Sequence, residues 1–375
     1  MRKVVFAAVL VTATALVGCS STAAGPTGPA LSSADLASVN AVLQQYEAPP
    51  QYKAPGSPID ASKLKGKRID TIPVSSAIPF CNATDDELAK LAQAAGLQFS
   101  AYQNQGQLSQ WVQGFNAAAS DRADLINIFC GLDAEKVAPQ VQQATDRGTP
   151  VVAAHTYAIG QPALPALKGV VYGAYVKAAQ LMADGVIANT KGQANVLVLT
   201  SPSTSNSPFM EQAMKDEFAK RCPSCKVDYF GVNVPDWAKS IDPKVRAAIS
   251  SNPNLNYVVP LYDGMVQFVN PAITATGAVG KVHVASFNAT PGVLDQIREG
   301  DIVNFEVGED PAWLAGAILD QDMRILLGQP LIENYEAGVR VFTKDNVKDA
   351  GVPAQLGQGY GTAAVPGYKK LWGVS

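Results

Sequence analysis

The sequence predicts an α/β protein built of two lobes, each a doubly wound parallel sheet. From residue 66 onward, short apolar runs alternate with segments whose apolar residues recur at helical spacing. Apolar strands of this length, each followed by a helix, are typical of parallel sheets covered on both faces. The pattern restarts at residue 194, and the chain of 375 residues is long enough for two domains. Ligands of such sheets bind at the carboxyl ends of the strands, so the cleft between the lobes is the expected site.

The first block of the pattern contains short runs rich in apolar residues, and each predicts a strand. Its first helix is expected to begin at Thr84 as N-cap, because acidic residues fill the turn that follows, and to end at Gly96. The segment 168–174 is a further apolar run near the end of the block. The expected strands are 68–75, 97–103, 123–129 and 149–155, and the expected helices are 84–96, 108–120, 134–148 and 175–192.

The second block repeats the same alternation up to residue 328. Pro271 interrupts one expected helix, and Pro291 lies in the first turn of another, where proline is well tolerated. The expected strands are 194–201, 226–232, 255–262, 281–287 and 301–308, and the expected helices are 208–221, 245–252, 264–277, 291–300 and 311–328.

Residues 1–18 have the character of a secretory signal peptide. Arg2 and Lys3 give a positive start, and an apolar run follows up to residue 18. A membrane-spanning helix needs about 20 such residues, so this run is too short to span comfortably. Residues 19–65 are rich in Ser, Ala, Gly and Pro, which favours a flexible tether with a short helix at about 33–46. The folded body is expected to begin near Lys65.

The composition excludes several classes of function. The net charge of −3 gives no indication of a nucleic-acid partner. His155 and His283 are the only histidines, and the sequence has no run of metal-ligand spacing, so neither a metal nor a cofactor is expected. The sequence contains no nucleophile elbow, phosphate-binding loop or dinucleotide fingerprint, which argues against an enzyme.

Three of the five cysteines can be interpreted from their neighbours. Cys222 and Cys225 form a C-x-x-C pair, which fits either a structural disulfide or a redox centre. The structural disulfide is favoured because a helix ends at the pair, whereas redox pairs of the thioredoxin type open one. The segment 16–19, Leu-Val-Gly-Cys, resembles the lipobox of bacterial lipoproteins. This resemblance implies cleavage before Cys19, lipidation of that residue and an anchor in the cell membrane, outside the cytoplasm.

Four further segments carry a family resemblance by their order and spacing. They are SSAIPF at 75–80, RGTPVVAAHT at 147–156, the segment 284–307 and EDPAWLAGAILD at 309–320. Together they resemble the type I periplasmic binding proteins, of the ribose-binding, sugar-solute branch. The resemblance covers about residues 66–330 and implies two lobes joined by a three-segment hinge.

The hinge of that family fixes the expected domain boundaries. The three crossings fall near 172–174, 308–311 and 329–331, and each of these places is a loop between expected elements. The first lobe would then contain residues 66–172 and 309–330. The second lobe would contain residues 173–308 and 331–375.

The resemblance also implies which residues contact a ligand. Phe80 and Trp237 match aromatic residues that stack on sugar rings, although a core position is the alternative for Phe80. Tyr262 and Asp263 match a polar pair at a strand end, and Asn288 stands where many sugar binders have Asp.

Three further positions belong to the same set of candidates. Glu309 matches a glutamine near the hinge, but for Glu309 and Asp263 a carboxylate at a helix N-terminus is an equal alternative. His155 stands where the family has Asp, and it could instead be a strand-end histidine satisfied by the backbone. Asn206 occupies the region where the family has an Arg.

These departures bear on the ligand. The Asn that precedes Pro-Phe in the family is Ile78 here, and most of the charged residues with which the family binds hydroxyl groups are absent or exchanged. A pentose or hexose held in the usual way is therefore in doubt. A polyol, a modified sugar or another small, partly apolar solute is the alternative.

Cys81 and Cys130 each follow the end of an expected strand. In the 2-1-3-4-5 strand order of such lobes these strands are neighbours. We expect the two cysteines to form a disulfide at the lip of the cleft, where it would brace the loop that carries Phe80.

The expected function is that of a substrate-binding lipoprotein of an ABC importer. It would close around one small solute by hinge bending and deliver it to a membrane permease, which the family resemblance implies. Its expected form is a monomer anchored through Cys19. A sensor that reports to a membrane receptor is an alternative with the same binding body. A DNA-binding repressor of this fold is excluded by the export signal and by the lack of a DNA-binding head.

Overall fold

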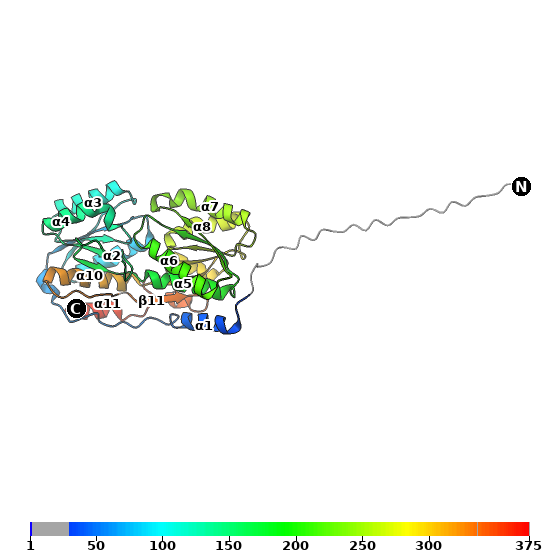
Figure 1. Ribbon diagram of the computed structural model, residues 1–375. Helices are drawn as coiled ribbons and strands as arrows, with labels where there is room; N and C mark the ends of the chain where they lie inside the picture. The colour runs from blue at the N-terminus through cyan, green and yellow to red at the C-terminus, as the bar shows by residue number, and fades with distance from the viewer. Residues whose placement is uncertain (2–29, 336, 375) are drawn as a thin grey trace.

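The computed structural model describes Met1, residues 30–335 and residues 337–374. Two α/β lobes lie side by side, with α2, α3, α4 and α10 around one sheet and α5, α6, α7 and α8 around the other (Figure 1). The predicted signal peptide beyond Met1, the lipidation site Cys19 and tether residues 19–29 lie outside the described residues.

The first lobe contains a five-stranded parallel sheet in the order β2-β1-β3-β4-β5. Its strands are β1 (Arg68–Pro73), β2 (Gln98–Ala101), β3 (Leu125–Phe129), β4 (Val151–Ala154) and β5 (Gly169–Val171). Its helices are α2 (Pro79–Ala94), α3 (Leu108–Ser120), η2 (Ala134–Val137), α4 (Ala138–Asp146) and α10 (Pro311–Leu327), the last of which packs on α2.

The second lobe contains a six-stranded sheet in the order β11-β10-β9-β8-β6-β7, in which β11 is antiparallel to β10. Its strands are β6 (Asn195–Thr200), β7 (Lys226–Gly231), β8 (Tyr257–Pro260), β9 (His283–Asn288), β10 (Val303–Glu309) and β11 (Val339–Phe342). Its helices are α5 (Tyr175–Asn189), α6 (Ser207–Arg221), η3 (Val234–Asp236), α7 (Trp237–Ser251), α8 (Asp263–Ala275), α9 (Pro291–Glu299) and η4 (Val347–Ala350).

Burial explains why the central strands appear in the sequence as continuous apolar runs. Every residue of β3 and every residue of β6 is buried, because helices cover both faces of each sheet. The edge strand β7 alternates between partly buried and exposed residues instead. The predicted fold, two parallel-dominated sheets with the order 2-1-3-4-5 in the first lobe, is confirmed.

The chain passes between the two sheets at segments that join the lobes. It leaves the first sheet after β5 and enters α5, which packs on α6 and β10. It leaves the second sheet at the end of β10 and enters α10, which packs on α2 and β5. After α10 it returns to the second sheet as β11.

The folded body begins well before Lys65, where the sequence placed it. Helix α1 (Ser33–Gln44) packs on α5, with Val39 and Leu43 buried. Further on, η1 (Ala61–Leu64) buries Leu64 against α10. The short helix was predicted, but the docking of the Pro-rich stretch was missed because it relies on scattered single residues rather than on a periodic pattern.

The end of the chain also corrects the predicted lobe boundaries. Helix α11 (Ala364–Leu371) packs on α10 of the first lobe, although residues 331–375 were assigned to the second. The indole N–H of Trp372 donates to Asp320 Oδ1 over 2.9 Å and fixes this contact. The apolar face of α11 indicates that the helix is buried, but the local sequence does not indicate which lobe it packs on.

Two helices begin earlier than their sequence predicts. Helix α2 begins at Pro79, and Thr84 lies inside it with its hydroxyl donating to the Phe80 carbonyl. Helix α7 begins at Trp237 and continues through Pro243, whereas the sequence predicts a helix only from residue 245. Proline at the first position of α2 preorganises the backbone, so the preference for Pro outweighed the Thr cap. Along the described part of the chain, each helix is too short or too polar to span a bilayer.

Candidate functional site

A cavity lies between the two lobes, at the carboxyl ends of the strands. It contains about 330 Å³ of space between atoms, and the two lobes are close together around it. Its walls are formed by Ile78, Phe80, Cys130, His155, Tyr175, Thr204, Asn206, Trp237, Tyr262 and Asn288.

Direct contacts between the lobes hold this closed arrangement on one side of the cavity. Leu132 of the first lobe and Thr204 of the second form an isolated antiparallel bridge. The Ser205 hydroxyl donates to the Thr156 carbonyl at 2.6 Å, and the Ser205 amide donates to the Gly131 carbonyl at 3.1 Å. These bonds can exist only when the lobes are closed, so they stabilise the closed form relative to an open one.

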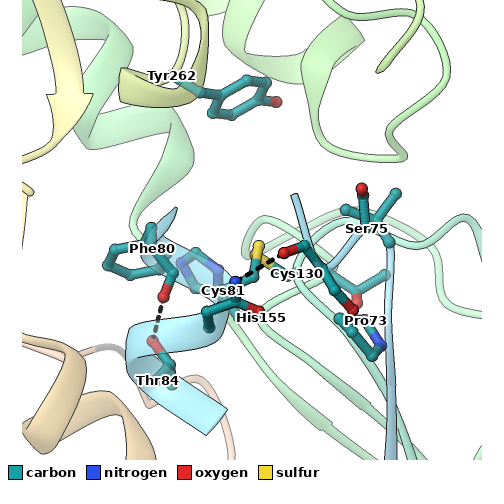
Figure 2. The surroundings of a disulfide bond; sticks show 12 residues. Pro73, Ser75, Phe80, Cys81, Thr84, Cys130, His155 and Tyr262 are labelled. Carbon is teal, nitrogen blue, oxygen red and sulfur yellow. Dashed lines mark hydrogen bonds between the residues drawn. A yellow bond between two sulfur atoms is a disulfide. The ribbon is translucent and has the colours of Figure 1, made fainter. Parts of the chain in front are cut away.

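The first lobe contributes Phe80 and a disulfide to the cavity wall. Phe80 lies in the first turn of α2, and its ring centroid is 5.3 Å from that of His155. Cys81 is joined to Cys130, which follows β3, as predicted. Figure 2 shows the disulfide beside Phe80 and His155, with the ring of Tyr262 on the opposite side of the cavity. The disulfide therefore ties the start of α2 to the end of β3 directly beneath the site.

The second lobe contributes two stacked aromatic rings. Trp237 and Tyr262 have ring centroids 6.3 Å apart and planes inclined by 26°. The indole N–H of Trp237 donates to the Val232 carbonyl, which fixes the orientation of the ring. The Tyr262 hydroxyl donates to Asn206 Oδ1 at 2.5 Å and lies 3.2 Å from Thr204 Oγ1. Burial raises the pKa of Tyr262, so this hydroxyl stays protonated.

Asn288 enters the cavity from a strained turn at the end of β9. Asn288 and the next residue, Ala289, have φ values of 127° and 53°, a region that non-glycine residues rarely adopt. Such strain persists only where the surroundings impose it, and it is often found at binding sites. Here a buried carboxylate pair imposes it from behind the cavity wall.

That pair consists of Asp263, at the start of α8, and Glu306, in β10. Asp263 accepts hydrogen bonds from the amide and hydroxyl of Thr290, and Glu306 accepts one from the Ala289 amide. The Ser286 hydroxyl lies 2.7 Å from Asp263 Oδ1 and 2.6 Å from Glu306 Oε2. One hydroxyl carries one hydrogen, so both contacts form when a protonated Glu306 donates to Ser286 and Ser286 donates to Asp263.

The surroundings of Glu306 favour this protonated form. Burial, followed by the charge of Asp263, raises the pKa of Glu306 well above its usual range. Burial also raises the pKa of Asp263, while its hydrogen bonds act in the opposite direction. Asp263 thus supports the turn of Asn288 rather than lining the cavity, in line with the structural alternative for this residue.

His155 and Glu309 form a second buried network, at the hinge. His155 Nε2 donates to Glu309 Oε2 at 2.6 Å, and the Ala174 amide donates to Glu309 Oε1 at 2.8 Å. The Tyr175 hydroxyl lies 2.9 Å from His155 Nδ1 and donates to the His155 carbonyl at 2.7 Å. Together these bonds fix the orientation of the imidazole ring at the end of β4.

The structure brings most of the predicted site residues together. Those that line the cavity are Phe80, His155, Asn206, Trp237, Tyr262 and Asn288. Asp263 and Glu309 lie behind the wall, each occupied by protein hydrogen bonds. The sequence did not single out Tyr175 and Thr204 as site residues. Tyr175 could have been found, since it directly follows the crossing at 172–174, whereas Thr204 carries no distinguishing signal.

The chemistry of the lining is neutral and aromatic. Among the described residues, Phe80, Trp237, Tyr175 and Tyr262 supply ring surface, and no Asp, Glu, Lys or Arg side chain borders the cavity. The amides of Asn206 and Asn288 can both donate and accept hydrogen bonds. Such a cavity suits a small uncharged molecule with an apolar face and polar edges, because an unpaired charge would be costly to bury there.

Two α/β lobes that close on a neutral cavity at a multi-segment hinge define a solute-binding protein. The chain belongs to the periplasmic binding protein domain family, whose model matches residues 69–330. The predicted family is therefore confirmed. This family is one of binding proteins, in agreement with the expectation that the chain is not an enzyme.

Solved structures share the fold over most of the chain. A solute-binding protein of an ABC transporter from Agrobacterium vitis, bound with α-D-tagatopyranose, has a TM-score of 0.69 and 21% identity, covering 76% of this chain and 97% of its own. An ABC sugar transporter subunit from Rhodobacter sphaeroides has a TM-score of 0.67 and 17% identity, covering 76% and 100%. A myo-inositol-binding protein from Caulobacter has a TM-score of 0.65 and 21% identity, covering 76% and 96%. The comparison with curated protein sequences found no match.

Proposed function

We propose that the protein is the substrate-binding lipoprotein of an ABC importer and that it binds a sugar, a polyol or a sugar derivative between its lobes. The observation that carries this proposal is the neutral cavity with aromatic rings from both lobes. Sugar rings have apolar faces that stack on aromatic side chains and hydroxyl edges that need hydrogen-bond partners. Phe80 on one side and Trp237 on the other are placed to stack on the faces of such a ring. Asn206 and Asn288 are placed to form hydrogen bonds with its hydroxyl groups.

The ligands of the structural neighbours support the ligand class without identifying the ligand. Their ligands include a ketohexose and a cyclic polyol, both uncharged. This chain retains the fold but supplies its polar contacts from amides and hydroxyls rather than from charged groups. We therefore propose a neutral ligand that the protein binds mainly through uncharged amides and hydroxyls, with few charge-assisted hydrogen bonds.

Two features support attachment to a membrane. The lipobox-like segment ends at Cys19, and the folded body is docked from Leu31, whose amide donates to the Lys191 carbonyl. Residues 19–30 would then link the lipid to the second lobe. We expect the full-length protein in the membrane fraction of cells, and a Cys19→Ser variant in the soluble fraction. An equal distribution of the two proteins would contradict the lipid anchor.

A thermal-shift screen tests the ligand class. A ligand that binds the folded state at 100 times its Kd stabilises it by about 2.7 kcal/mol, which is a readily measured rise in Tm. The screen would compare monosaccharides and polyols with nucleosides and small organic acids. We expect at least one neutral sugar or polyol to raise the Tm and the acids to leave it unchanged. A response confined to acids or nucleosides would overturn the proposal.

The role in import is tested separately in cells. Once a ligand is known, uptake of the radiolabelled compound would be measured in cells with and without the protein. We expect uptake to depend on the protein and to be restored by the wild-type gene. Normal uptake without the protein, together with loss of a transcriptional response to the ligand, would indicate a sensor instead.

A further inference from the structure

A second groove lies on the outer side of the cleft and shares a wall with the cavity. It contains about 770 Å³ of space, part of it open to solvent, and residues of both lobes line it. Ile78 and Trp237 border both the groove and the cavity. The two spaces are therefore neighbours that share one aliphatic and one aromatic side chain in their lining.

The lining of this outer groove is polar but neutral. Gln105 and Gln107 enter from the first lobe and Gln267 from the second, and all three side chains are exposed. Phe268 and Pro235 add apolar surface beside them. Among the described residues that border the groove, none is charged. Amides next to an aromatic ring again suit hydroxyl groups carried on a ring with an apolar face.

Trp237 is held rigidly at the junction of the two spaces. Its indole N–H is bound to the Val232 carbonyl, and the start of α8 packs against its ring. A Cβ at Gly264 would lie 3.0 Å from the Trp237 ring and 3.7 Å from the Ile78 side chain, so glycine lets both residues approach the start of α8. A fixed wall that borders both spaces can contact two adjoining units of one ligand.

We propose that the outer groove is a second subsite and that the ligand is a neutral disaccharide or similar glycoside, with one ring in the cavity and a second ring in the groove. This proposal rests on the proposed function and deepens it, because it names the size and class of the ligand. The cavity contains about 330 Å³ of space, whereas the groove beside it contains about 770 Å³, part of it open to solvent, between polar and apolar side chains. Glycosidic linkage of two rings would place the bond beside Ile78 and Trp237, the residues that border both spaces.

Isothermal titration calorimetry with size-matched sugars provides the first test. The probes are D-glucose, D-galactose, D-ribose and myo-inositol, together with cellobiose, maltose, lactose and melibiose. We expect at least one disaccharide to bind at least about tenfold more tightly than either of its component monosaccharides, since the second ring gains its own contacts. If monosaccharides bind and no disaccharide binds more tightly, the subsite is overturned while the proposed function stands. Failure of every probe to bind overturns both.

Variants that fill the groove provide the second test. Ala77 and Ala238 are exposed alanines that border the groove from opposite lobes. We expect Ala77→Trp and Ala238→Trp to weaken disaccharide binding at least about tenfold and to leave monosaccharide binding within about twofold. Ala119→Trp, at an exposed position of α3, is the control and should change neither. Equal weakening of both ligands by the groove variants would show that the groove is no separate subsite.

Discussion

His155 Nε2 lies 2.6 Å from Glu309 Oε2, and this bond joins the end of one sheet to the end of the other. His155 directly follows β4 of the first lobe, and Glu309 is the last residue of β10 in the second. Glu309 also accepts from the Ala174 amide, at the crossing before α5. One carboxylate thus connects two of the segments that pass between the lobes, and it borders the residues that line the cavity.

Replacement of Glu309 by glutamine should weaken the hinge. Glutamine can still accept from the Ala174 amide, but it loses the charge-assisted bond from His155. Because a buried bond to a charged group contributes about 1.5–3 kcal/mol, we expect the free energy of unfolding to fall by that amount. Urea denaturation measures it. Glu333→Gln, at an exposed position, is the matched control and should stay within about 0.5 kcal/mol of wild type. Equal losses in the two variants would contradict this role.

Trp237 should report ligand binding directly. Replacement by phenylalanine keeps a ring but loses the bond to the Val232 carbonyl and part of the surface against Tyr262. We expect binding to weaken by about 1–3 kcal/mol and the ligand-induced change in tryptophan fluorescence to disappear. Trp111→Phe is the control, since Trp111 donates to the Val74 carbonyl away from the cavity. A fluorescence change that persists in Trp237→Phe would place the responding tryptophan elsewhere.

The disulfide beneath Phe80 should affect both stability and binding. A cross-link over 49 residues lowers the entropy of the unfolded chain, so we expect Cys81→Ser/Cys130→Ser to lose about 2–4 kcal/mol of stability. Ligand affinity should fall as well, because Cys130 borders the cavity and Cys81 adjoins Phe80. Thermal unfolding and calorimetry measure the two effects.

The second disulfide offers the matched control. Cys222 and Cys225 are three residues apart at the end of α6, so their cross-link closes a small loop away from the cavity. Cys222→Ser/Cys225→Ser should therefore lose less stability and keep full affinity. If both double variants retained wild-type affinity, the disulfide between Cys81 and Cys130 would have no role in the site.

The fold could be predicted because its information is local and repeated. The buried strands β3 and β6 appear in the sequence as runs of apolar residues between helices of regular spacing. This alternation predicts the α/β fold class and the strand order of a doubly wound lobe. The docking of α11 on α10 and of η1 below it could not be predicted in this way. Those contacts depend on single buried side chains whose partners lie far away in the sequence, 52 positions in the case of Trp372 and Asp320.

The candidate site could be predicted only in part, for the same reason. The cavity positions of Phe80, Trp237 and Asn288 follow from their place at element ends, which any doubly wound lobe turns toward the cleft. Whether a carboxylate such as Asp263 faces the ligand or the protein depends on a partner in another strand. Glu306 is that partner, and it lies within an apolar strand whose pattern does not indicate a shared proton.

The Asp263–Glu306 pair should make stability depend on pH. Burial raises the pKa of Glu306 well above the unfolded value of about 4.3, so the folded state binds the extra proton in the intervening range. Its contribution is complete below about pH 4 and is lost as the pH rises through the folded-state pKa. The free energy of unfolding should therefore fall with pH by up to about 1.4 kcal/mol per unit from this group.

Glu306→Gln isolates this contribution. Its amide can donate to Ser286 as the protonated carboxyl does, but it cannot ionise. We expect the variant to match wild type near pH 4 and to exceed its stability at pH 8. Glu299→Gln, at an exposed position, should follow the wild-type curve and serves as the control. Burial also raises the pKa of Asp322, to about 8, but that group is unchanged in both proteins and cancels in the comparison. Parallel curves for Glu306→Gln and wild type would refute the shared proton.

Variants of Ser205 and Ser203, which lie in one loop, distinguish an effect on lobe closure from an effect on folding stability. The Ser205 hydroxyl donates across the cleft to the Thr156 carbonyl, so it stabilises the closed form alone. The Ser203 hydroxyl accepts from the Val234 amide within the second lobe, so it is present whether the lobes are open or closed. Ser205→Ala should weaken ligand binding by about 0.5–1.5 kcal/mol, or roughly 2- to 12-fold, because binding then yields one bond fewer on closure. Ser203→Ala should lower the Tm but leave the Kd unchanged. Calorimetry on both variants decides the matter, and an equal loss of affinity in the two would mean that the bond between Ser205 and Thr156 does not set the closing equilibrium.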